Sequence, residues 1–201
     1  MNSAQEALER LCDPAHEVSA HYFIEQDGKI TQLVGELERA WHAGVGSWGD
    51  VTDVNSSSIG IELCNAGNRP FPEPQISVLK MLLDELRERW RIPAHGIIGH
   101  SDMAPGRKQD PGRLFDWQDL ANEGLAVFRG RPHAKVLDFI EAAKLFGYFV
   151  PEQDENNLLT QSLILETFRQ RFRPNAKGLL SSKDIKVLSD LGQSYPSNVN
   201  S

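Results

Sequence analysis

The chain has 201 residues, 40% of them hydrophobic and 24% charged, which is ordinary for a globular protein of one large domain or of one medium and one small domain. The net charge of −7 argues against a general nucleic-acid binder, because such proteins need clustered lysine and arginine. No apolar run approaches the length of a membrane span, and no secretory signal is visible at the first residues. Two cysteines, Cys12 and Cys64, do not make a disulfide framework.

The first half of the chain predicts a mixed β-sheet flanked by helices, the α/β class. A capping box at Ser3 begins a helix that Asp13-Pro14 ends. Alternation from 18 to 24 predicts a strand, and the Asp27-Gly28 turn leads to a return strand at 29–34. Further along the chain we expect a strand at 58–63, a helix from Pro74 that buries Ile76, Leu79, Leu83, Leu86 and Trp90, and a short buried strand at 96–99.

The composition changes after Trp117, and a stretch rich in glycine and proline at 124–132 has the character of a linker. Three short helical patterns follow it, enough for a small three-helix domain with a marginal core. They cover 136–146, about 156–171 and about 184–191. We therefore predict an α/β domain at 1–125, a linker at 126–133, a helical domain at 134–193 and a tail at 194–201.

The segment from Gly99 to Gly112 carries half of a possible metal site. His100 and Asp110 are both competent zinc ligands, and a catalytic zinc needs three protein ligands and an open position for water. The alternative is a hydrogen-bonded loop histidine and a turn-forming aspartate. Lys108 lies two residues before Asp110, where a cation can stabilise an oxyanion, although a solvated surface lysine is the alternative for it.

Glu62 interrupts an otherwise apolar strand, and carboxylates are rarely buried without a partner or a function. Near a zinc-bound water, such a glutamate can act as a general base and return the proton to a leaving amine. The alternative is an edge strand on which Glu62 faces solvent.

A loop with arginine and aromatic residues holds a further candidate. His42 stands between Trp41 and Ala43-Gly44, close to Arg39, and such a loop suits a sugar or a peptide carboxylate. The alternative for His42 is a loop histidine that hydrogen-bonds the backbone. His21 alternates on a strand face, where we expect a partly buried structural histidine.

Four ordered blocks resemble the amidase-2 family of zinc-dependent N-acetylmuramoyl-L-alanine amidases. The blocks are 18–22, 39–44, 55–63 and 99–112, and the resemblance covers roughly residues 3–120. It implies a fold related to peptidoglycan recognition proteins, Zn²⁺ as the cofactor, and hydrolysis of the amide between N-acetylmuramic acid, or its anhydro form, and L-alanine. The helices after 134 resemble a peptidoglycan-binding module through Gly147-Tyr148 and 168–174, which implies a periplasmic or outer-membrane-associated protein of the cell envelope.

Carried over residue by residue, His100 and Asp110 match two of the family's three zinc ligands. Glu62 matches the catalytic glutamate, Lys108 the lysine that supports the oxyanion, and Arg39 a position that holds the peptide stem. The family's first ligand, a histidine on a strand before the first helix, has no match in this sequence. We therefore expect the chain as given to bind zinc weakly and to hydrolyse muropeptide poorly.

The other substrate-binding residues that we expect are Trp41, His42 and Arg107. His21 is a poor substitute ligand, because the family keeps a histidine there in addition to its three ligands. Peptidoglycan or muropeptides are the expected partners, with no nucleic acid, no transmembrane segment and a monomeric chain. The alternative function is a peptidoglycan-binding protein that does not catalyse.

Overall fold

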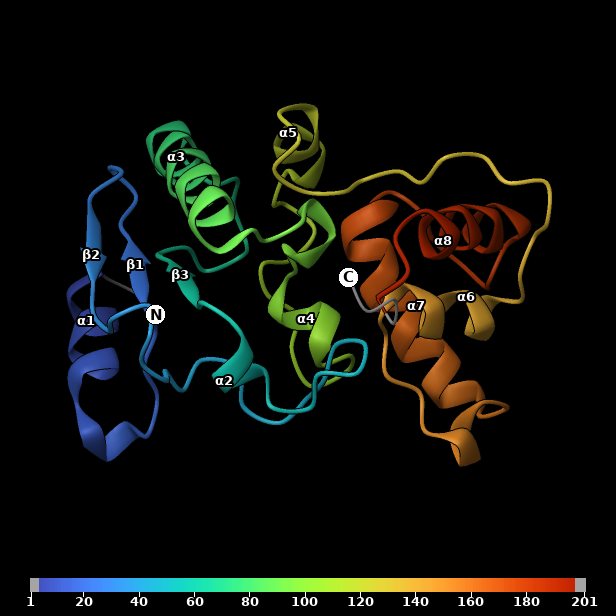
Figure 1. Ribbon diagram of the computed structural model, residues 1–201, viewed down its shortest axis with the longest axis horizontal. Helices are drawn as coiled ribbons and strands as arrows, with labels where there is room; N and C mark the ends of the chain where they lie inside the picture. The colour runs from blue at the N-terminus through green and yellow to red at the C-terminus, as the bar shows by residue number, and fades with distance from the viewer. Residues whose placement is uncertain (1–3, 198–201) are drawn as a thin grey trace. The chain divides into compact units, whose positions relative to one another are not determined.

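The structure is a computed structural model that describes residues 4–197, and its chain forms two compact units (Figure 1). One unit comprises Met1–Gly46 and Asp53–Ile92, and the other comprises Ser47–Thr52 and Pro93–Ser201. Within residues 4–197, no helix is long and apolar enough to cross a membrane. The domain limits predicted from the sequence stay predictions.

The first unit contains a three-stranded mixed sheet in the order β2-β1-β3 (Figure 1). Strand β1 (Tyr22–Ile24) pairs antiparallel with β2 (Ile30–Gln32) and parallel with β3 (Ile61–Leu63). All three residues of β1 are buried. The predicted hairpin and mixed sheet are confirmed, with strands shorter than the sequence pattern suggests, and Gly28 occupies the turn with a φ of 90° that suits glycine.

Four helical segments complete this unit: α1 (Ala4–Cys12), the 3₁₀ turn η1 (Pro14–His16), α2 (Val54–Ser57) and α3 (Glu73–Trp90). The N-terminal helix is confirmed, although its predicted cap at Ser3 lies outside the described residues. Helix α3 buries Leu79, Leu83 and Leu86 as expected. Trp90 does not belong to the core: it is the last residue of α3 and is 40% exposed, and its indole N–H donates to the Glu36 carboxylate at 2.5 Å.

The predicted strand at 96–99 is wrong. The 3₁₀ turn η2 (Ala94–Gly96) leads into extended residues that pair with no strand in the described chain. Side chains occupy the backbone groups that a ladder would use: Arg171 donates to the Ile97 carbonyl at 3.0 Å, and the Gly99 N–H donates to Asp102 at 2.8 Å. His100 therefore begins a short helix, α4 (His100–Met103), instead of ending a strand.

The rest of the second unit is helical, as predicted for its C-terminal part. Helix α5 (Trp117–Asn122) was not expected. The three predicted helices are confirmed as α6 (Phe139–Phe146), α7 (Leu158–Phe172) and α8 (Ser182–Ser194). The 3₁₀ turn η3 (Glu152–Asp154) precedes α7. Their shared core includes the fully buried side chains of Phe139, Phe146, Phe168, Leu188 and Leu191.

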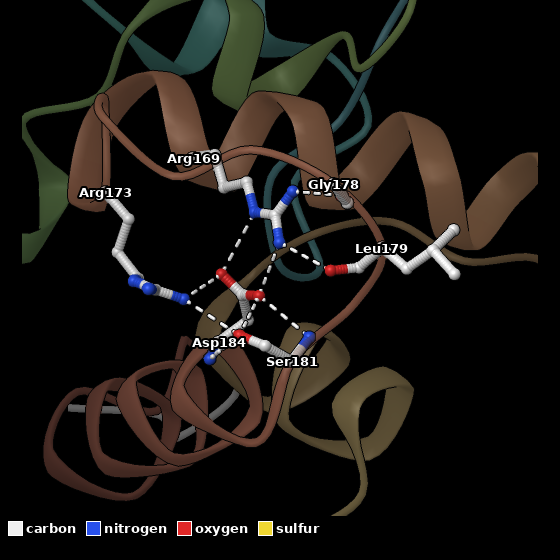
Figure 2. Close-up of polar contacts among 6 residues, drawn as sticks. All are labelled: Arg169, Arg173, Gly178, Leu179, Ser181 and Asp184. Atoms are coloured by element: carbon white, nitrogen blue, oxygen red, sulfur yellow. Dashed lines mark hydrogen bonds and ion pairs between the residues drawn. The ribbon is translucent and has the colours of Figure 1, made fainter.

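The connection between α7 and α8 is held by a buried carboxylate, Asp184 (Figure 2). Arg169 donates to both oxygens of Asp184, at 3.0 and 2.6 Å, and Arg173 forms a second ion pair with it. The Ser181 hydroxyl donates to the same carboxylate at 2.6 Å. Arg169 also donates to the carbonyls of Gly178 and Leu179, so one guanidinium orders the whole connection.

Candidate active site

The candidate residues fall in both units of the chain. Glu62 and the loop residues Arg39, Trp41 and His42 belong to the first unit, and the segment 99–112 belongs to the second.

His100 and Asp110 lie side by side although ten residues separate them. His100 Nδ1 is 3.0 Å from Asp110 Oδ2, and the Ser101 N–H donates to the Asp110 carbonyl at 2.9 Å, which closes the turn. Two ligand atoms of a tetrahedral zinc with bonds of about 2.0–2.1 Å are about 3.3 Å apart. The pair therefore fits two corners of a zinc site. Within residues 4–197, the structure groups no three histidine, cysteine or acidic side chains as a complete metal centre.

The charges around this turn favour an ionised Asp110. Loss of water would raise the pKa of its carboxyl group, but the hydrogen bond and the charge of His100, with a smaller contribution from Lys108, hold that pKa below its usual value. Lys108 is half-buried and its backbone N–H donates to the Ala104 carbonyl at 3.0 Å, whereas Arg107 is exposed. The catalytic role of Lys108 and the substrate-binding role of Arg107 stay predictions.

Asp102 is a site residue that sequence reasoning missed. Its side chain is 1% exposed and accepts hydrogen bonds from the Gly99 N–H at 2.8 Å, from Arg171 at 2.6 Å and from the Tyr148 hydroxyl at 3.2 Å. Burial raises the pKa of Tyr148 well above its ordinary value, so that hydroxyl remains a donor. The available signal was an acidic residue three positions after Gly99, the spacing of a helix cap.

Glu62 occupies the middle of β3, opposite Phe23 of β1. Its strand lies at an edge of the described sheet, as the alternative interpretation supposed, yet the side chain is half-buried and not fully exposed to solvent. This position leaves the role of a general base open to Glu62 and does not test it.

Arg39 and Trp41 are brought together by the structure. The Arg39 guanidinium lies 4.6 Å from the Trp41 ring centroid, and the Trp41 side chain is 56% exposed. Arg39 is also bonded to Asp53 at 2.5 Å and to Ser56, and its hydrogen bond is the main cause that lowers the pKa of Asp53. The loop thus presents a guanidinium that is stacked on an aromatic face and paired with a carboxylate.

The backbone around His42 is fixed by a residue that sequence reasoning missed. Buried Asn55 accepts hydrogen bonds from the backbone N–H groups of His42 and Ala43, at 3.0 and 2.8 Å. The His42 ring packs directly over Gly60, where an added Cβ would lie 2.3 Å from the ring. The signal for Asn55 was its place as the first residue of the 55–63 block that resembles the family, although nothing local in the sequence shows that it bonds to the 42–43 backbone.

His21 is a structural histidine, as predicted. It is 1% exposed, and its Nδ1 accepts a hydrogen bond from the Gly60 N–H at 2.9 Å. Its Nε2 must then carry the proton, which it donates to the Glu38 carbonyl at 3.0 Å. Both ring nitrogens are used by the backbone, so His21 has no lone pair left for a metal.

The family model for N-acetylmuramoyl-L-alanine amidases, Amidase_2, matches residues 1–113. The chain belongs to this family. Among curated relatives, it is 36% identical to the N-acetylmuramoyl-L-alanine amidase AmiD of Escherichia coli K12 over 188 residues, covering 79% of this chain and 67% of AmiD. It is 42% identical to the 1,6-anhydro-N-acetylmuramyl-L-alanine amidase AmpD of Haemophilus influenzae over 102 residues, or 50% of this chain and 55% of AmpD.

Solved structures extend the similarity over the described fold. The E. coli AmiD complex with the substrate anhydro-N-acetylmuramic acid-L-Ala-D-γ-Glu-L-Lys matches with a TM-score of 0.84 at 30% identity, covering 95% of this chain and 84% of that one. AmpDh3 from Pseudomonas aeruginosa matches with a TM-score of 0.84 at 28% identity, covering 97% and 89%. The predicted fold class is confirmed by these structures.

Proposed function

We propose that this protein hydrolyses the amide bond between N-acetylmuramic acid, or its anhydro form, and L-alanine in peptidoglycan or muropeptides. The observation that carries the proposal is the 3.0 Å contact of His100 Nδ1 with Asp110 Oδ2, within the part of the chain that the amidase family model matches. The AmiD complex with an anhydro-muropeptide supports a muropeptide as the substrate.

His100 and Asp110 are the residues that would hold a zinc ion. An imidazole nitrogen and a carboxylate oxygen are ordinary zinc ligands. When bound, zinc would polarise the scissile carbonyl and lower the pKa of a water molecule. By the resemblance, they stand at two of the family's three ligand positions.

Glu62 and Lys108 perform the proton and charge chemistry in this proposal. The Glu62 carboxylate takes a proton from the attacking water and returns it to the departing alanine nitrogen. The Lys108 ammonium stabilises the negative charge that develops on the carbonyl oxygen.

Four residues bind the substrate in this proposal. The Arg39 guanidinium, stacked on Trp41, would bind a carboxylate of the peptide stem. His42, whose backbone is fixed by Asn55, would contact the sugar or the peptide, and exposed Arg107 would attract the acidic stem.

The helical segment 134–193 would hold the enzyme on the cell wall, and the protein would act as a monomer in the cell envelope. The likeness of that segment to peptidoglycan-binding modules supports this part of the proposal, and binding to insoluble sacculi, measured by co-sedimentation, tests it.

Zinc-loaded protein is incubated with anhydro-muropeptide, and the released peptide is quantified by liquid chromatography and mass spectrometry. We expect Glu62→Gln to lower kcat by about 10²–10⁴-fold, the usual contribution of general acid–base catalysis. The matched control is Glu88→Gln, an exposed glutamate of α3, which should retain full activity. Equal turnover by the two variants would refute the role of Glu62. Because only two of the family's three ligand positions have a match in this sequence, we expect slow cleavage by the wild-type protein at saturating zinc, and no cleavage above a metal-free control would refute the proposed reaction.

A further inference from the structure

The segment that carries His100 and Asp110 is bonded to helix α7 through one buried ion pair. Arg171 of α7 and Asp102 of α4 lie 2.6 Å apart, and their side chains are 2% and 1% exposed. Water is therefore excluded from both charges, so each requires the other. Asp102 stands two residues after His100 in the same short helix.

A second nitrogen of Arg171, Nη2, holds the backbone on both sides of that helix. Its Nη2 donates to the Ile97 carbonyl at 3.0 Å and to the Val127 carbonyl at 3.1 Å, and its guanidinium lies 3.9 Å from the Trp117 ring centroid. One side chain thus fixes Ile97 before α4 and Asp102 within it.

A helix of four residues is not stable on its own, because its nucleation cost is not recovered. The first residue of α4 is His100, and the Ser101 N–H holds the Asp110 carbonyl. The direction of the His100 ring and the closure of the turn at Asp110 both depend on where α4 is held. Asp102, through Gly99, Tyr148 and Arg171, holds it.

We propose that Arg171 is a positioning residue for His100 and Asp110, and that the helical segment supports the metal-binding turn in addition to any binding of its own. The inference rests on the zinc centre of the proposed function. Loss of a residue that orients metal ligands typically lowers metal affinity by about 10–100-fold, and we expect that loss here.

The test compares Arg171→Met with a matched control on the same helix, Arg169→Met. Both changes break a buried arginine–aspartate pair, but the partners of Arg169 are Asp184 and the carbonyls of Gly178 and Leu179, all of them in α8 or in the α7–α8 connection. Two properties are measured in the full chain: zinc affinity by competition with a fluorescent chelator, and amide hydrogen exchange of the 99–112 segment without metal.

We expect R171M to weaken zinc binding by about 10–100-fold and to speed exchange in the 99–112 segment by at least about tenfold. R169M should change both values by less than about threefold while lowering the unfolding temperature. If R171M fails to fold, Arg171→Lys is measured in its place. The lysine ammonium keeps the ion pair with Asp102 but lacks the planar guanidinium group. Zinc affinity should therefore fall less than we expect for R171M and more than in R169M.

The inference would be overturned if R171M (or R171K in its place) and R169M had equal effects on zinc affinity and on amide exchange. Absence of saturable zinc binding by the wild-type protein would overturn the proposed zinc centre instead. The exchange rates, which need no metal, still decide whether Arg171 orders the turn.

Discussion

Gly60 is the position where one added methyl group should disturb the candidate substrate loop. An alanine Cβ there would lie 2.3, 2.5 and 2.7 Å from Cγ, Cδ2 and Nδ1 of His42, whereas ordinary contacts begin at 3.4 Å. The ring must therefore retreat by about 1 Å, and Gly60→Ala tests whether it can do so cheaply.

Neither backbone is free to absorb this clash. The Gly60 N–H donates to His21 Nδ1 at 2.9 Å, and the Gly60 carbonyl accepts from the N–H groups of His21 and Tyr22 at 3.0 and 3.1 Å. The His42 N–H is held by Asn55. Overpacking of this kind costs about 1–3 kcal/mol, and the reduced entropy of the unfolded chain returns about 0.4–1 kcal/mol, so the net loss lies between about 0 and 2.6 kcal/mol. The 2.3 Å approach to the His42 ring places Gly60→Ala in the upper part of this range.

Gly35→Ala is the matched control. The nearest atom to its added Cβ is Glu38 Cγ at 3.6 Å, and its backbone φ is not positive, so this variant should be neutral or gain up to about 1 kcal/mol. The assay is urea unfolding of the full chain followed by far-UV circular dichroism at pH 7. Indistinguishable midpoints for the two variants would refute the steric reasoning.

Two further predictions concern buried polar groups and pH. Asp184→Asn leaves Arg169 and Arg173 without their carboxylate and should cost about 3–5 kcal/mol. Burial alone would raise the pKa of Asp184, but hydrogen bonds from Arg169 and Ser181 hold it far below its usual range. The difference in free energy of unfolding between the wild type and Asp184→Asn, measured by calorimetry, should therefore have its full size above about pH 4 and decrease below it. A difference that stays unchanged down to pH 2 would contradict this reasoning. Burial and the Glu36 hydrogen bond raise the pKa of Tyr22 to about 12, so wild-type stability should fall as pH rises from about 10 to 12. Tyr22→Phe should be less stable than wild type by about 1 kcal/mol at pH 7 and lack this alkaline loss, and the same loss in both proteins would exclude Tyr22 as its source.

The sequence predicted those elements whose signals are local. Helix α3 has an apolar face and a proline in its first turn, and the β1–β2 hairpin has alternation around Asp27-Gly28. The 96–99 segment has the apolar character of a strand, but a strand also needs a partner. Arg171, more than 70 residues later in the chain, donates a hydrogen bond to the Ile97 carbonyl, and no local pattern could predict that bond. Helix α5 was missed because its six residues carry little periodicity beyond the Asp116 cap.

The same limit applies to the candidate site. Residue types that suit catalysis or metal binding are recognisable at their spacing, so His100, Asp110 and Glu62 could be proposed from the sequence. The backbone at His42 and at Gly99, the residue before His100, is held by Asn55 and Asp102. Each of these side chains accepts hydrogen bonds from the backbone of a loop or short helix that cannot satisfy itself. We expect substitution of either residue to lower activity without touching a reacting group, so a loss of activity is compatible with a catalytic role and with a positioning role. Metal affinity and amide exchange, measured beside turnover, separate the residues that react from those that hold them.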